Sequence, residues 1–130
     1  MTIFEAIQEV RRYEQEHLPF METIVDRDIL AAIGFAQDND SGGIYLKQLL
    51  LLGISSFATV NRRVTRLVRS GAVAKQRSQL DHRVQYLKLT DQAKAAFELY
   101  ADMLPRAFNR RLAQRNTAPG HRGGTPAASG

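Results

Sequence analysis

Four arginines, Arg62, Arg63, Arg66 and Arg69, fall within residues 56–70, and no acidic residue accompanies them. Guanidinium groups are well suited to bind phosphates and to donate paired hydrogen bonds to guanine. Apolar residues recur in the same stretch at helical spacing, which predicts an amphipathic helix. One face of this helix would dock on the core, and it contains Phe57, Val60, Val64, Leu67 and Val68.

The opposite face of this helix is the candidate surface for a nucleic acid. It contains the small residues Ser55 and Ala58, which permit close approach, with Thr59, Arg62, Arg66 and Arg69, and Arg63 flanks it. Recognition helices enter the major groove with their N-terminal half. Thr59 and Arg62 are therefore the first candidates for base contacts, Arg66 is the next, and Arg69 is a candidate for phosphate. The alternative is a solvated amphipathic helix, but such helices usually mix acidic and basic residues.

A second basic element is the loop from Arg77 to Arg83, between two segments that we expect to be strands, 72–76 and 84–89. The basic tip of such a hairpin can lie in the minor groove, where narrow A·T-rich stretches attract arginine. Arg83 is the candidate for this contact, and Asp81 is placed to orient its guanidinium group. The alternative leaves Asp81 as a turn former and Arg83 as a solvated charge.

Charge is distributed unevenly along the 130 residues. Residues 1–43 contain nine acidic and three basic residues, whereas residues 44–89 contain nine basic residues and Asp81 as the one acidic residue. A block of one sign indicates a surface that binds a polyanion. The expected phosphate contacts come from Lys47, Arg63, Arg69, Lys75, Arg77 and Lys88.

The elements that must position these residues follow from periodicity, capping residues and glycines. We expect helices at 3–17, 26–37, 46–52, 56–70 and 91–112, a short strand at 44–45, and the hairpin described above. Thr2 and Glu5 form a capping box, Ser55 or Ser56 caps the central helix, and Thr90 caps the last one. This order predicts a mainly α fold with a small β-hairpin wing, the winged helix-turn-helix.

Other classes of protein lack support in the sequence. There is no cysteine, so disulfides, thiolate metal sites and cysteine nucleophiles are excluded. Glu14 and His17 have the spacing of a metal-binding pair but lack further acidic partners, so we expect a pair on a helix surface. We therefore expect no enzyme, no metal and no cofactor. No membrane span or secretory signal is recognisable, which favours the cytoplasm.

Several motifs between residues 44 and 100 resemble the MarR family of transcriptional regulators. They are Ser55-Ser56-Phe57-Ala58-Thr59-Val60, Arg66-Leu67-Val68-Arg69-Ser70-Gly71-Ala72-Val73, Asp81-His82-Arg83 and Leu87-Lys88-Leu89-Thr90. The resemblance implies a homodimer on double-stranded DNA, held by the N- and C-terminal helices, with Arg83 as the minor-groove arginine and Asp81 as its partner. It also implies a base-reading face with Thr59, Arg62 and Arg66.

We expect one DNA-binding domain over residues 1–112 and a disordered Gly/Pro/Ala-rich tail over 113–130. The helix after Thr90 is shorter than the dimerisation helices of that family, and no cluster of residues supports a small-molecule effector. The main prediction is a sequence-specific regulator of transcription. Two alternatives stay open: a winged helix used as a protein-interaction module, suggested by the acidic segment 1–43, and a plasmid or phage replication accessory.

Overall fold

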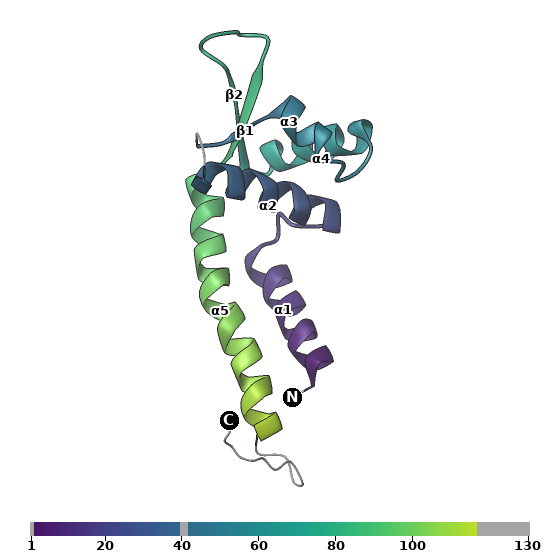
Figure 1. Ribbon diagram of the computed structural model, residues 1–130, viewed down its shortest axis with the longest axis vertical. Coiled ribbons are helices and arrows are strands. Elements are labelled where there is room, and N and C mark those ends of the chain that lie inside the picture. The colour runs from purple at the N-terminus through teal and green to yellow at the C-terminus, as the bar shows by residue number, and fades with distance from the viewer. Residues whose placement is uncertain (1, 40–41, 117–130) are drawn as a thin grey trace. The chain divides into compact units, whose positions relative to one another are not determined.

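The computed structural model describes residues 2–39 and 42–116, with side chains to residue 109. The chain forms two compact units: Leu18–Phe97 is one, and the segments up to His17 and from Glu98 make the other. The elements, labelled in Figure 1, are α1 (Ile3–His17), α2 (Ile24–Asn39), β1 (Ile44–Tyr45), α3 (Leu46–Leu51), α4 (Phe57–Arg69), β2 (Val73–Arg77), β3 (Gln85–Leu89) and α5 (Asp91–Asn116). This is the predicted winged helix-turn-helix order.

The larger unit is built around one apolar core. Its α4 contributes side chains spaced by four and three residues, which therefore lie on one helical face. α2 contributes Ile29 and its neighbours, and β3 contributes Leu87. Full burial of each such aliphatic side chain stabilises the fold by about 1.5–3 kcal/mol. The fully buried large members of this core are Ile29, Leu30, Ile33, Leu49, Val60, Val64, Leu67, Val73 and Leu87.

An antiparallel sheet in the order β1-β3-β2 carries the wing. β2 and β3 pair from Val73 opposite Leu89 to Arg77 opposite Gln85. Beyond the ladder the Ser78 N–H donates to the Val84 carbonyl oxygen at 2.8 Å, and the hairpin projects away from the helices (Figure 1). The wing, which we define as residues 73–89, is thus an extended two-stranded arm fixed at its base.

Caps and glycines set the bounds of α4. The Ser56 side chain accepts a hydrogen bond from the Thr59 N–H at 3.1 Å, as an N-cap does. Gly53 and Gly71 have φ of 75° and 84°, a conformation that residues with a Cβ rarely adopt. The predicted helix 56–70 is therefore confirmed to within one residue at each end.

Thr90 joins three elements at the start of α5. Its hydroxyl donates to the Gly71 carbonyl oxygen at 2.7 Å and accepts from the Ala93 N–H at 3.2 Å. Its own N–H donates to the Ala72 carbonyl oxygen at 3.1 Å. The predicted cap is confirmed, and it also ties α5 to the end of α4. α5 continues to Asn116, beyond the expected residue 112, and residues 117–130 of the predicted tail lie outside the described residues.

The smaller unit contains α1 and the later part of α5. The predicted capping box is present, since Thr2 N–H donates to Glu5 and Glu5 N–H donates to the Thr2 hydroxyl oxygen. The expectation of a surface pair at Glu14 and His17 was wrong, because Glu14 is only 4% exposed and accepts a hydrogen bond from the Tyr100 hydroxyl. Spacing along α1 gives no information about a partner 86 residues later in the chain.

One aromatic side chain lies differently from the prediction. Phe57 was expected on the docked face of α4, yet it is 56% exposed. It lies at the edge of its apolar stripe, beyond the part that the neighbouring elements cover, whereas the exposed Phe35 lies on the side of α2 away from Ile29 and Ile33. Helical periodicity gives the direction of a stripe but not the width that its neighbours bury.

Gly43 lies where the chain before β1 passes close to β3. A Cβ at this position would lie 2.4 Å from the Leu87 carbonyl oxygen and 2.8 Å from the Tyr86 ring. Backbone cannot yield as the end of a flexible side chain can. Glycine is therefore required here for close approach of two backbones.

We expect Gly43→Ala to destabilise the protein by about 1–3 kcal/mol, the usual effect of overpacking a tight site. Gly34→Ala is the matched control, because its Cβ would meet only Leu89 Cδ1, at 3.3 Å, within α2. Urea unfolding followed by circular dichroism measures both variants. Equal midpoints for the two variants would contradict the steric role of Gly43.

Candidate nucleic-acid interface

The outward face of α4 is the first component of the candidate interface. Val60, Val64 and Leu67 point into the core, so the residues opposite them face solvent. No described residue makes an ion pair with Arg62 or Arg69, and α4 has no acidic residue. The exposed residues that form this outward face are Ala58, Asn61, Arg62, Thr65 and Arg69.

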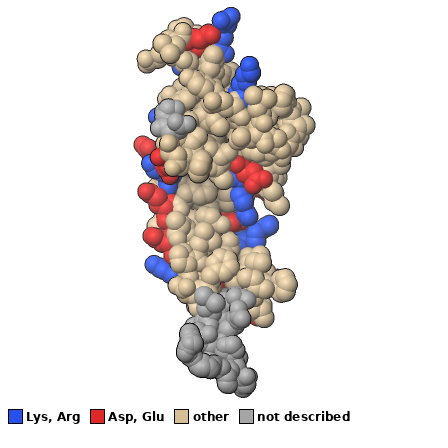
Figure 2. Space-filling model, viewed as in Figure 1, with Lys and Arg blue, Asp and Glu red and all other residues tan. Residues whose placement is uncertain are grey.

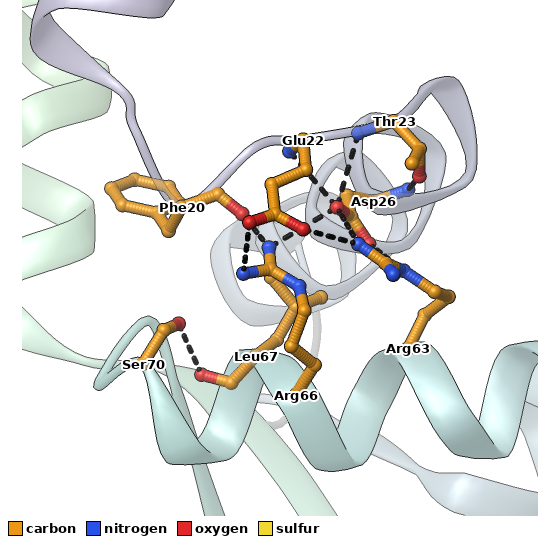
Figure 3. Close-up of polar contacts among 8 residues, drawn as sticks. All are labelled: Phe20, Glu22, Thr23, Asp26, Arg63, Arg66, Leu67 and Ser70. Carbon is orange, nitrogen blue, oxygen red and sulfur yellow. Dashed lines mark hydrogen bonds and ion pairs between the residues drawn. The ribbon is translucent and has the colours of Figure 1, made fainter.

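The other two arginines of α4 turn toward the start of α2 (Figure 3). Arg63 Nε donates to Asp26 Oδ1 at 2.8 Å and its Nη2 donates to Asp26 Oδ2 at 2.7 Å, a bidentate pair. Arg66 Nη2 donates to the same Oδ2 at 3.1 Å and to the Phe20 carbonyl oxygen. Glu22 completes this cluster, with carboxylate oxygens 3.1 Å from Arg63 Nη2 and 3.3 Å from Arg66 Nη1.

Asp26 is the centre of this arginine–carboxylate cluster and is fully buried. Its Oδ2 also accepts the N–H groups of Glu22 and Thr23 at 2.9 and 3.1 Å, while Asp26 N–H donates to the Thr23 hydroxyl oxygen. Thr23 and Asp26 thus form a capping box that begins α2 at Ile24. The pattern Thr-x-x-Asp was visible in the sequence, and it explains why α2 begins two residues before the predicted start.

The electrostatics of the cluster follow from these contacts. Burial alone raises the pKa of Asp26, but the Arg63 hydrogen bonds and the two backbone N–H groups outweigh it and hold that pKa below its ordinary value. The hydrogen bond to Asp26 in turn raises the pKa of Arg63, in spite of desolvation. Both side chains are therefore charged at neutral pH, and the pair is satisfied within the chain.

These contacts correct three sequence-based placements. Arg66 was expected on the outward face and Arg63 beside it, but their guanidinium groups bind Asp26 and Glu22. Thr59 was expected on the outward face, but it is half-buried and its hydroxyl oxygen accepts a hydrogen bond from Ser56 at 2.9 Å. Its contact with a base stays a prediction. A helical wheel places all three near the polar side and cannot show which neighbour occupies that flank. Asn61 and Thr65, which were not among the predicted contact residues, also lie on the outward face.

The wing supplies the second component. Arg83 is exposed, with 91% of its side chain accessible, and its Nε and Nη2 donate to Asp81 at 3.1 and 3.2 Å. Those hydrogen bonds, with the Arg83 N–H, hold the pKa of Asp81 below its ordinary value. Arg77 donates to the His82 carbonyl oxygen at 2.8 Å and so braces the loop. The structure thus brings together Asp81 and Arg83 in the predicted geometry, although their contact with DNA stays a prediction.

The remaining predicted residues surround these two components. Lys47 of α3, Lys75 and Arg77 of β2 are exposed, Lys88 of β3 is half-buried, and Ser55 is half-buried in the turn before α4. Figure 2 shows basic side chains projecting from the wing, with acidic atoms near its tip. The terminal helices instead carry side chains of both signs. Unbalanced positive charge is thus a property of the winged unit.

The described part of the chain does not contain the residues that a metal site or a membrane span would need. Within it, no group of three or more His, Asp or Glu side chains is placed to hold a metal ion. None of the helices described there combines the length and the apolar character needed to cross a bilayer.

We expect Asp26→Asn to destabilise the fold by an amount near the lower end of about 3–5 kcal/mol, because it leaves two arginines without their buried partner while both keep some access to water. The exposed Asp28→Asn is the matched control. A folded-state pKa below the unfolded one gives stability that is complete above about pH 4 and is lost as the pH falls through the folded-state value. Unfolding by urea across pH 2–7 should therefore show the difference between parent and Asp26→Asn shrinking toward low pH. A constant difference would contradict this.

Comparisons with known proteins complete the description. No family model and no curated protein matches this sequence. Among solved structures, a MepR mutant from S. aureus superposes with a TM-score of 0.67 at 14% identity, over 85% of this chain and 76% of that one. Transcriptional regulator Tm0710 from Thermotoga maritima gives 0.64 at 20% identity, over 85% and 72%. A mutant of MarR from E. coli complexed with operator DNA gives 0.58 at 22% identity, over 90% and 80%.

These similarities span most of each chain. At such identities they establish architecture. The chain therefore has the winged-helix fold of the MarR-type transcriptional regulators.

Proposed function

We propose that this protein is a sequence-specific regulator of transcription that binds double-stranded DNA through α4 and the wing. One observation carries the proposal: the outward face of α4 presents Asn61, Arg62 and Arg69 to solvent, without an acidic residue on that helix. A face of hydrogen-bond donors with only positive charges suits the major groove, where base edges form the floor and phosphates line the walls. The structural similarity to MarR in complex with operator DNA, and to a MepR mutant bound to an oligodeoxyribonucleotide, supports it.

Within this proposal the residues of the outward face contact different parts of the DNA, according to their position along α4. Arg62 lies in the N-terminal half, which enters the groove, and it donates to guanine O6 and N7. Arg69 lies in the last turn and binds phosphate. Arg63 and Arg66 act indirectly, because their pairs with Asp26 and Glu22 fix the rotation of α4 about its own axis.

The wing adds a second contact in the proposal. Arg83 enters the minor groove and Asp81 orients its guanidinium group through the hydrogen bonds given above. Phosphate contacts from exposed cations supply most of the affinity and its dependence on salt. These cations are the exposed Lys47, Arg69, Lys75 and Arg77, together with the half-buried Lys88.

We further propose that residues 1–112 act as one DNA-binding domain that dimerises through its N- and C-terminal helices. Large apolar side chains are exposed on α1 and on the later part of α5, and a second copy would cover them: Phe4, Ile7, Leu99 and Phe108. A symmetric dimer places two recognition helices on successive turns of the duplex. A regulator of this kind works in the cytoplasm, and the proposal gives it no enzymatic activity.

Selection of bound sites from random duplex DNA at physiological salt tests the function directly. We expect a two-fold symmetric consensus whose half-sites lie about one helical turn apart. The full chain is used, and an unselected pool of the same length is the reference. No enrichment over that pool would contradict sequence-specific binding, and an asymmetric single half-site would contradict the dimer.

Arg62→Ala and Lys75→Ala separate specificity from affinity. We expect Arg62→Ala to lose about 1–3 kcal/mol of discrimination between the selected site and a random duplex, because a base contact is removed. Lys75→Ala should weaken binding to both duplexes alike and lower the salt slope by about one. Fluorescence anisotropy titrations at several salt concentrations measure both effects. Lys94→Ala, which changes an exposed lysine in the first turn of α5 outside the proposed interface, is the control and should bind as the parent does.

A further inference from the structure

Phe57 is the first residue of α4, and the fold does not explain its side chain. It is 56% exposed and lies outside the apolar core, whereas Val60, three residues later, is fully buried. The N-cap of the helix is Ser56, so capping does not require Phe57. An aromatic ring left in water forgoes the stabilisation that burial would give. Its position at the start of α4 leaves the ring available to a partner outside the chain.

The neighbours of Phe57 narrow the chemistry of that partner. Asn61 follows four residues later, so the two side chains are adjacent on the helix surface. Both Asn61 and the small Ala58 are exposed. Thr65 donates its hydroxyl hydrogen to the Asn61 carbonyl oxygen at 2.9 Å, so its methyl group is the part left to face outward. This side of α4 thus presents apolar groups around one side-chain amide.

The edges of the base pairs in the major groove offer one apolar group, the C5 methyl of thymine, and phenylalanine and alanine are side chains that contact it. An asparagine amide pairs in the same groove with N6 and N7 of adenine. We propose that Phe57 reads a thymine methyl and Asn61 an adjacent adenine, so the part of each half-site that faces the first turns of α4 is A·T. This deepens the function proposed above and rests on it.

The alternative occupant of this surface is a protein. Leu51 and Leu52, at the end of α3, are also exposed, and with Phe57 they offer apolar surface in the helix-turn-helix. Charge favours DNA, because residues 41–80 contain no acidic residue and the adjacent outward face carries Arg62 and Arg69. A polyanion matches such surroundings and an ordinary protein surface does not.

The test replaces single thymines by deoxyuridine in the selected duplex. Deoxyuridine keeps every hydrogen-bonding group of thymine and lacks only the methyl group. We expect one or two positions in each half-site at which the parent binds about 3–5-fold more weakly, the effect of one methyl group no longer removed from water. Phe57→Ala should bind the thymine duplex more weakly and should not distinguish thymine from deoxyuridine at those positions.

Leu52→Ala is the matched control and should keep the full response to deoxyuridine. If no single replacement weakens binding by the parent, or if Phe57→Ala keeps the parent's response, the thymine contact is overturned. DNA binding itself would still stand wherever the selected duplex is preferred to random DNA. If Phe57→Ala and Leu52→Ala both abolish self-association in sedimentation and leave the deoxyuridine response intact, the surface belongs to a protein contact and the inference fails.

Discussion

A buried carboxylate determines how α4 sits in this fold. Asp26 is removed from water, and an unpaired charge in that position would be very unfavourable. Its charge is balanced by Arg63 and Arg66, which reach it from α4, and by backbone N–H groups at the start of α2. Because both arginines come from one face of α4, the pairing accepts only a narrow range of rotations of that helix about its axis. The hydrophobic effect that drives core packing is non-directional, whereas bidentate hydrogen bonds have direction.

That constraint decides which charges are available to a nucleic acid. The cluster of Asp26, Glu22, Arg63 and Arg66 has no net charge, so half of the arginines on α4 add little to the field at the surface. Arg62 and Arg69 remain, on the side opposite the core. α4 thus has three faces with different roles. An apolar face packs on the core, a charged face fixes the rotation of the helix, and the outward face carries hydrogen-bond donors that have no partner among the described residues.

The sequence allowed accurate prediction of features that depend on local chemistry. Ser56 and Gly71 bound α4, and Thr90 begins α5, because caps and left-handed glycines are determined by residues only a few positions apart. Features that depend on contacts between residues far apart in the sequence could not be predicted. Two segments about 40 residues apart meet at Asp26 and Arg63, and periodicity holds no information about that meeting. The acidic excess in residues 1–43 suggested a protein partner, yet Glu14, Glu22 and Asp26 are bound within the fold.

The same distinction applies to the candidate interface. The direction of the apolar stripe on α4 was predictable, which is why Arg62, Ala58 and Arg69 were assigned correctly to the exposed side. The width of the buried stripe was not, since it depends on how far α2 and the sheet extend over the helix, and Phe57 was therefore misplaced.

With two arginines engaged internally, the outward face of α4 has few charges for a polyanion, and affinity must come from elsewhere in the winged unit. The wing can supply this affinity, because Lys75 and Arg77 of β2 and Arg83 of the loop are exposed along one continuous hairpin. Coulombic contacts of this kind hold any duplex, whatever its sequence. Under the proposed function, recognition is then left to a few groups on α4 that carry little charge. We infer that these groups can discriminate by shape and hydrogen bonding because the Asp26 pairs hold the helix at a fixed rotation.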